Sequence, residues 1–489
     1  MINRNKLYII IIIIASIATH FLFFGQPRET VFDEVHFGKF ISGYFTHEYF
    51  FDIHPPLGKL LISGVGYITG FEPGFSFAEI GQGFPDDAYL WLRLLPILAG
   101  VLLPLVIFLF ALRLGLSPLA SFAAGLFIVL ENALLAQSRL MLLDPFLLLF
   151  GFSALLFYFI YETSSHNTKF LLPAGIFAAL AVSVKWTGAT FLLIILIIEI
   201  FKTGTNRWMV KNWPRYLISR AVFLVIIPGV IYFSIFAIHF SLLSKSGPGD
   251  AFMTPQFRKT LQGYNDPETK TVIPLNLWGK FKELNIQMYK SNATLTAGHP
   301  YSSKWYTWPF MIRPIYYWHE QGPQPTQSAR IYLLGNPVIW WTSTLAVAYL
   351  AVAALALVLK AFKTKTVLTL WRTNNLPVFL LGAWIINLLP FVGISRAMFL
   401  YHYFTALIFG ILILTYLIDQ MDKTKNPALE KDRGSDPKTN SPFQGRGKRI
   451  FAILLAVSII TFVFFAPLTY GRPLSEKMYN ARIWLKTWL

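Results

Sequence analysis

Long apolar segments separated by short polar connections fill most of this chain. A helix needs about 20 apolar residues to cross a bilayer, so the pattern predicts about eleven transmembrane helices in an all-α polytopic membrane protein. The expected spans are Leu7–Phe24, Ala88–Ala111, Leu119–Ala136, Leu142–Tyr161, Phe170–Val184, Thr187–Phe201, Leu217–Phe240, Asn336–Leu359, Leu376–Ile394, Phe399–Ile418 and Ile450–Tyr470.

The first apolar segment could be a secretory signal or a retained helix. Its apolar run is as long as a membrane crossing, and no small-x-small cleavage pattern follows it at residues 25–28. We therefore expect a retained helix.

The basic residues predict the orientation, because cytoplasmic loops carry an excess of Lys and Arg. With the N-terminus inside, the inner loops hold most of these residues, whereas three short outer connections hold one each: Arg139, Lys185 and Arg396. An odd number of spans places the C-terminus outside. The polar inner loop 421–448 is expected to be a flexible linker between a core, 1–420, and a last helix with an outer tail, 449–489.

Composition excludes several classes of protein. Of 489 residues, 55% are hydrophobic and only 13% are charged, against about 25% in soluble domains. The absence of cysteine excludes disulfides and thiolate chemistry. The net charge of +18 would suggest nucleic acid in a soluble protein, but here the loop bias explains it. No phosphate-binding glycine motif occurs, which argues against an ATP-driven transporter.

Two long outer segments, 25–87 and 241–335, are the expected place of function. The first holds nine of the 24 acidic residues, including Asp33 and Glu34. Asp33 precedes apolar residues at helical spacing, so it could be an N-cap and nothing more. The alternative is a carboxylate at the membrane surface that takes a proton from an acceptor.

A turn at His54-Pro55-Pro56, just after Asp52, follows in the same segment. The two prolines start the next helix, and the histidine is well placed to face the same outer pocket as Asp33.

Arg139, Lys185 and Arg396 each lie at the outer mouth of a span. A charge near the bilayer is costly, so each either extends to lipid headgroups or marks a site. Three cations on the less basic side favour a shared anionic ligand such as a lipid phosphate.

Aromatic residues are dense in His299–Pro309, which includes Tyr301 and Trp305, and around His402. Such residues form interface belts or stack on sugar rings, and composition does not separate these alternatives.

Several of these runs closely resemble protein O-mannosyltransferases, which are polyprenyl- or dolichyl-phosphate-mannose-dependent enzymes with a GT-C fold. The runs are VFDEVHFGKF at 31–40, FFDIHPPLGKL at 50–60, SRLMLLD at 138–144, AVSVKWTG at 181–188, His299–Pro309 and Tyr401–Phe404. The resemblance implies transfer of mannose from a membrane polyprenyl phosphate to Ser or Thr of proteins on the outer face. It implies a lipid donor and secreted or membrane protein acceptors, with the translocon as a candidate meeting point in the plasma membrane.

The roles expected within this scheme follow the chemistry. Transfer in one inverting displacement needs a base, assigned to Asp33, while Glu34 orients the site or binds acceptor backbone. Charge stabilisation of the leaving phosphate is assigned to Arg139, Lys185 and Arg396. Acceptor or sugar binding is assigned to His54, Asp52, His299, Tyr301, Trp305 and His402.

The expected reaction requires no metal or other cofactor, although a divalent cation bridged by Asp33, Glu34 and phosphate is an open alternative. One departure from the family is the length of Ser241–Gly335, about half that of the β-trefoil MIR domain of eukaryotic members. We therefore expect a short, bacterial-type member without that domain.

Two rivals remain. One is an enzyme of the same fold that glycosylates an outer-leaflet lipid or cell-wall glycan. The other is a polyprenyl-lipid transporter, which predicts ionisable residues near the bilayer midplane. Glu131 and Glu199 are the acids within spans that would fit it.

Overall fold

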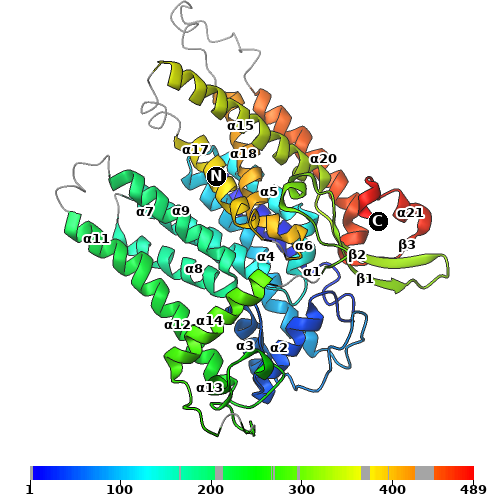
Figure 1. Ribbon diagram of the computed structural model, residues 1–489. Helices are drawn as coiled ribbons and strands as arrows, with labels where there is room; N and C mark the ends of the chain where they lie inside the picture. The colour runs from blue at the N-terminus through cyan, green and yellow to red at the C-terminus, as the bar shows by residue number, and fades with distance from the viewer. Residues whose placement is uncertain are drawn as a thin grey trace, which may run out of the picture.

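Helices account for most of this protein (Figure 1). The computed structural model describes residues 4–164, 167–203, 213–265, 267, 270–294, 298–364, 375–394, 396–423 and 445–489. In the N-terminal half the helices are α1 Arg4–Phe21, α2 Glu34–Thr46, α3 Leu57–Thr69, α4 Ala88–Arg113, α5 Pro118–Val129, α6 Asn132–Ser138, α7 Asp144–Thr163, α8 Leu171–Val184, α9 Ala189–Thr203, α11 Trp213–Ala221 and α12 Ile227–Leu242.

The C-terminal half combines long helices with a small sheet (Figure 1). Its helices are α13 Pro255–Arg258, α14 Leu277–Thr294, α15 Pro337–Thr364, α17 Asn375–Leu388, α18 Phe404–Lys423, α20 Arg446–Tyr470 and α21 Glu476–Asn480, with the short helices η6 Trp305–Phe310 and η8 Leu400–Tyr403. Its strands are β1 Ile315–Gln321, β2 Gln327–Leu333 and β3 Leu474–Ser475.

The polytopic helical prediction is confirmed. Among the described residues, seven helices are long and apolar enough to cross a membrane, and the pair α5–α6, bent by 58°, makes up to eight. The remaining three expected spans coincide with shorter helices, α8, α9 and α17. The count of eleven crossings therefore stays a prediction.

The bend between α5 and α6 has a local cause in Glu131. Its Oε2 accepts the backbone N–H of Leu134 at 2.8 Å, and its Oε1 accepts that of Asn336 at 2.7 Å. One buried carboxylate thus caps α6 and also binds the backbone just before α15. A charge that could have marked a transport path is instead a structural cap.

Glu199 also has a structural role. It accepts hydrogen bonds from Tyr158 and Arg220, which joins α9 to α7 and α11. Neither Glu131 nor Glu199 therefore supports the transporter alternative.

The sequence patterns missed a three-stranded sheet, ordered β1-β2-β3. Its third strand comes from the C-terminal tail and pairs antiparallel with β2, with Gln327 opposite Ser475. The tail therefore lies at the same end of the helices as the second long loop segment (Figure 1). Most of the predicted linker, 424–444, lies outside the described residues.

Candidate functional site

Asp33 occupies the N-cap position of α2 but does not cap it. Its backbone is helical, at φ −66° and ψ −5°, and its carboxylate makes no cap hydrogen bond. The half-buried carboxyl has no hydrogen-bond partner among the described residues. Burial raises the pKa of Asp33 to about 7, with Lys185 opposing this and the charges of Asp144 and Asp52 adding to it. A carboxyl with such a pKa is matched to proton transfer near neutral pH.

Glu34, expected to orient the site or bind acceptor backbone, is fully buried. Arg93 in α4 donates to both of its oxygens, Nε to Oε1 at 2.8 Å and Nη2 to Oε2 at 2.6 Å. The backbone N–H groups of Val31 and Met141 donate as well, each at 2.9 Å. No oxygen of this carboxylate is left for a substrate, so the arrangement favours the first of the two expected roles, orienting the site, over acceptor binding. The carboxylate holds three segments together.

Arg139, predicted from the sequence as a phosphate ligand, donates to backbone carbonyls in the structure. Its Nη1 donates to the carbonyls of His20 and Leu22 at 2.6 and 2.7 Å, and its Nη2 donates to that of Phe23 at 2.7 Å. The guanidinium also lies over the Tyr470 ring, 4.7 Å from its centroid. It closes the C-terminal end of α1, where helix carbonyls lack partners.

Lys185 lies in the site and is held by an ion pair. Its Nζ is 2.8 Å from Oδ1 of Asp144, at the start of α7, and 5.0 Å from the ring centroid of Tyr401. Gln137 donates to the other oxygen of Asp144 at 2.6 Å and accepts a hydrogen bond from Tyr317 at 2.5 Å. A buried network thus fixes the cation whose charge acts most strongly on Asp33.

Arg396 is the least occupied of the predicted cations. Its Nε is buried and has no hydrogen-bond partner in the described structure. Its charge acts on His54 together with Lys185 and Lys59, and burial with these cations lowers the pKa of His54 well below its ordinary value. His54 is therefore neutral at pH 7, so its ring can donate a hydrogen bond to a hydroxyl or accept one from it.

Asp52 forms a buried ion pair with Lys59 of α3, which also donates to the carbonyls of His54 and Pro55 at 3.0 and 3.2 Å. The pair orders the His-Pro-Pro turn. Lys59 engages Oδ2 of Asp52, so the predicted role of Asp52 in sugar or acceptor binding rests on Oδ1 and stays a prediction.

Two of the predicted aromatic ligands reach the site. His299 packs edge-on against Phe32, next to Asp33, with ring centroids 6.3 Å apart. His402 stacks on Tyr401, with ring centroids 4.7 Å apart.

The other two predicted aromatics lie farther from the acids. Tyr301 packs beside His299 at 5.9 Å, and Trp305 packs edge-on against Tyr306 at 5.6 Å. In the described structure no ring contact brings Trp305 to Phe32 or Tyr401, so its assignment as a ligand stays a prediction.

Sequence reasoning missed Arg93, Gln137, Asp144 and Tyr317. Arg93 and Asp144 carried a usable signal, because each is a charge within an expected apolar span, the same rule that singled out Lys185. Gln137 and Tyr317 carried none, since neither polarity nor spacing distinguishes them from their neighbours.

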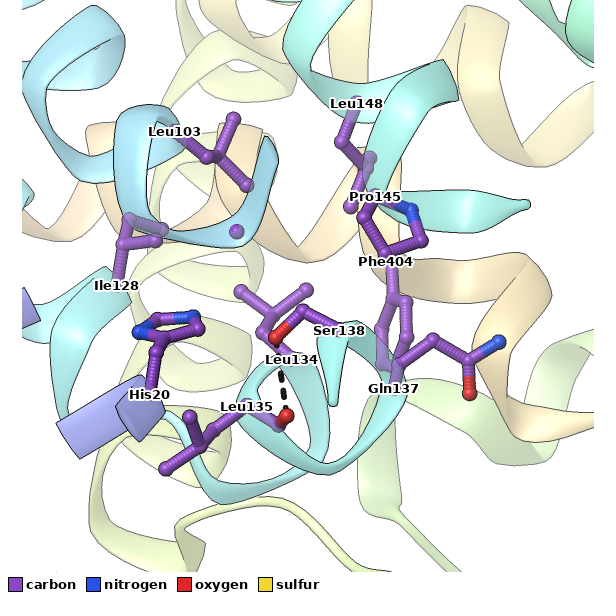
Figure 2. Close-up of a pocket in the computed structure, with 11 residues that line it drawn as sticks. His20, Leu103, Ile128, Leu134, Leu135, Gln137, Ser138, Pro145, Leu148 and Phe404 are labelled. Carbon is purple, nitrogen blue, oxygen red and sulfur yellow. Dashed lines mark hydrogen bonds between the residues drawn. The ribbon is translucent and has the colours of Figure 1, made fainter. Parts of the chain in front are cut away.

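A pocket beside this network has Leu103, Ile128, Leu134 and Phe404 in its lining (Figure 2). His20 faces it from α1, while the amide of Gln137 points away from it. Its lining includes neither Asp33 nor Lys185. Within the described residues, no three His, Asp or Glu side chains gather as metal ligands.

Two family models match the chain. Residues 10–244 match the model described as dolichyl-phosphate-mannose-protein mannosyltransferase. Residues 277–488 match the C-terminal four-transmembrane region of protein O-mannosyltransferase.

Curated relatives agree with these matches. Dolichyl-phosphate-mannose–protein mannosyltransferase 4 of Candida albicans is 34% identical over 51% of this chain and 35% of its own length. Protein O-mannosyltransferase 1 of Drosophila melanogaster is 31% identical over 69% of this chain and 38% of its own length. The matched region thus spans little more than a third of these relatives.

Solved structures share the fold. The S. cerevisiae protein O-mannosyltransferase Pmt1-Pmt2 complex bound to the sugar donor matches with a TM-score of 0.85 at 20% identity, covering 100% of this chain and 93% of that one. The Archaeoglobus fulgidus oligosaccharyltransferase AglB, in complex with an inhibitory peptide and a dolichol-phosphate, matches with a TM-score of 0.53 at 13% identity, covering 98% and 57%.

Proposed function

Because this chain belongs to the protein O-mannosyltransferase family, we propose that it transfers mannose from a polyprenyl-phosphate-mannose donor to Ser and Thr hydroxyls of proteins, with inversion at the sugar. The names of the matched relatives support the donor and the acceptor class. The observation that carries the proposal is Asp33, a half-buried carboxyl with a pKa of about 7, within the field of the Lys185 cation.

The reaction is a single displacement. As the hydroxyl oxygen of Ser or Thr bonds to the anomeric carbon, Asp33 takes its proton, because an alcohol is a poor nucleophile while protonated. The bond between that carbon and the phosphate oxygen breaks on the opposite face. Its electron pair leaves with the polyprenyl phosphate, which becomes a monoester anion.

Charge stabilisation of the leaving phosphate falls to Lys185 and Arg396. Lys185 has three N–H donors, and its hydrogen bond to Asp144 uses one of them. Arg396 offers a buried Nε with no partner among the described residues. We leave Arg139 out of this set, since backbone carbonyls take three of its five N–H donors.

No metal takes part in the proposed scheme. A cation bridging Asp33 and Glu34 would need an oxygen of Glu34, and Arg93 with two backbone N–H groups engages both of them. Transfer should therefore persist in excess EDTA.

The protein is a multi-pass membrane protein. We place it in the plasma membrane, with the N-terminus cytoplasmic and the site and C-terminus on the outer face. The acceptors are then secreted or membrane proteins, met as they emerge from the translocon.

The test is transfer of radiolabelled mannose from polyprenyl-phosphate-mannose by protein in lipid nanodiscs. A Ser/Thr-rich peptide should become labelled, and the same peptide with Ala at those positions should not. The Asp33→Asn variant serves as the inactive control. Label that appears in lipid or glycan instead of peptide would contradict the proposal in favour of the same-fold alternative.

A further inference from the structure

Two backbone irregularities, 285 residues apart, meet beside Asp33. Phe32 has φ +46°, in the left-handed region that bulky residues rarely adopt. In β1 the pairing with β2 shifts between Tyr316 and Trp318, which leaves Tyr317 as the extra residue of a bulge. Such strain and such bulges persist near functional sites, where they redirect a side chain.

The two redirected rings stack on one another. Phe32 and Tyr317 have ring centroids 4.3 Å apart and planes 13° apart, and Tyr317 is only 1% exposed. Since Phe32 directly precedes Asp33, the stack fixes the backbone from which the carboxyl extends. The second outer segment thereby contacts the start of α2.

The hydroxyl of Tyr317 begins a chain of hydrogen bonds that ends at Lys185. It donates to Oε1 of Gln137 at 2.5 Å, so the amide must turn its Nε2 toward Asp144, to which it donates at 2.6 Å. The other oxygen of Asp144 holds Lys185 at 2.8 Å. The carboxylate of Asp144 can only accept, so it turns Nε2 of the amide toward itself, and the Tyr317 hydroxyl holds the amide in that orientation through its oxygen.

We propose that Tyr317 is a positioning residue that sets both reacting groups of the site, Asp33 through its ring and Lys185 through its hydroxyl. This inference rests on the proposed function for the identity of the reaction. It also gives the outer sheet of the C-terminal half a direct part in organising a site whose Asp33, Gln137, Asp144 and Lys185 come from the N-terminal half.

The Tyr317→Phe variant isolates the hydroxyl, because it keeps the stack on Phe32 and the buried volume. The matched control is Tyr332→Phe in β2, which removes a buried hydroxyl contact of 2.6 Å to Tyr479 and touches no residue of the site. We expect Tyr317→Phe to lower kcat about tenfold, the size of one buried hydrogen bond, with KM for the acceptor peptide near wild type. Tyr332→Phe should leave both constants unchanged.

A second measurement does not depend on transfer. The unfolding temperatures of the wild type and of Asp33→Asn are measured as a function of pH. Their difference reports the titration of Asp33 in the folded protein. The groups that act on this carboxyl are Lys185, Asp144 and Asp52, with the hydroxyls of Tyr317 and Tyr401 nearby.

Without the Tyr317 hydroxyl, Asp144 loses its oriented donor and holds Lys185 less tightly. The cation can then attract Asp33 more strongly, so the midpoint of this titration should fall. A fall in Tyr317→Phe but not in Tyr332→Phe supports the positioning role even if the wild type labels no peptide. An unchanged or raised midpoint, or an equal shift in the control, overturns it.

Discussion

Glu34 and Arg93 form a bidentate ion pair that is shielded from solvent, with N–O distances of 2.8 and 2.6 Å. The acidic residue next to the proposed base is therefore part of the scaffold. Arg93 also donates to the carbonyls of Pro27 and Glu29, at 2.7 and 2.8 Å. The pair fixes the loop that precedes α2 and therefore also the orientation of Asp33 at the start of that helix.

Removing the charge of Glu34 should unfold the protein more readily. Glu34→Gln leaves the Arg93 guanidinium buried without a counter-ion, which costs about 3–5 kcal/mol. Asp87→Asn is the control, because it breaks the exposed pair of Asp87 with Arg28, worth at most about 1 kcal/mol. Thermal unfolding in nanodiscs measures both, and equal small shifts would contradict the structural role of Glu34.

Asp33 should be dispensable for folding and required for transfer. Since its side chain caps nothing, Asp33→Asn and Asp33→Ala should both fold and bind donor. Both should lose about 10²–10⁴-fold in kcat, the contribution of a positioned base. An active Asp33→Asn enzyme would end the assignment and direct attention to His54.

Activity and the stability contribution of Asp33 should change in opposite directions with pH. The base must be deprotonated, so kcat should rise with pH through about 7, the pKa of Asp33 in the fold. The fold raises this pKa from 3.8, so its stability contribution is fully present below that value and is lost as pH rises through about 7. Relative to Asp33→Asn, the wild type should therefore lose unfolding temperature over that range. A pH-independent difference between the two would contradict the raised pKa.

The two arginines should separate donor binding from folding. Arg396→Ala removes a cation whose Nε has no partner, so the protein should fold while kcat/KM for the donor falls about tenfold to a hundredfold. Arg139→Ala should instead lower the unfolding temperature, because three carbonyls lose their donor. The reverse pattern would restore Arg139 to the phosphate site.

The absence of cysteine makes the topology testable by single-cysteine labelling. Gln324→Cys at the hairpin tip and Met478→Cys in the tail should react with an impermeant maleimide in intact cells, because β3 pairs with β2 on one side. Lys169→Cys, in a predicted inner loop, should react only after the cells are opened. Labelling of the hairpin without the tail would contradict the arrangement of the sheet.

The sequence by itself determined the membrane class and the positions of the apolar helices, and it singled out candidate site residues. Apolar runs are local signals, and each expected span coincides with helix in the structure. Lys185 and Arg396 stood out because a charge beside a bilayer is costly, and Asp33 stood out because it lies in an acidic outer segment, just before a run of apolar residues at helical spacing.

Only the tertiary structure decided which charges are free to act. Glu34 has the same kind of functional group as Asp33, and Arg139 has the same one as Arg396. Their partners, however, come from segments distant in the sequence: Arg93 in α4 pairs with Glu34, and the carbonyls at the end of α1 bind Arg139. The bulge at Tyr317 and the backbone of Phe32 have no local sequence signal either. Whether a carboxylate can act as a base or serves only to hold segments together depends on which donors the fold brings within 3 Å of it. Those donors are set by packing between distant segments rather than by residue type.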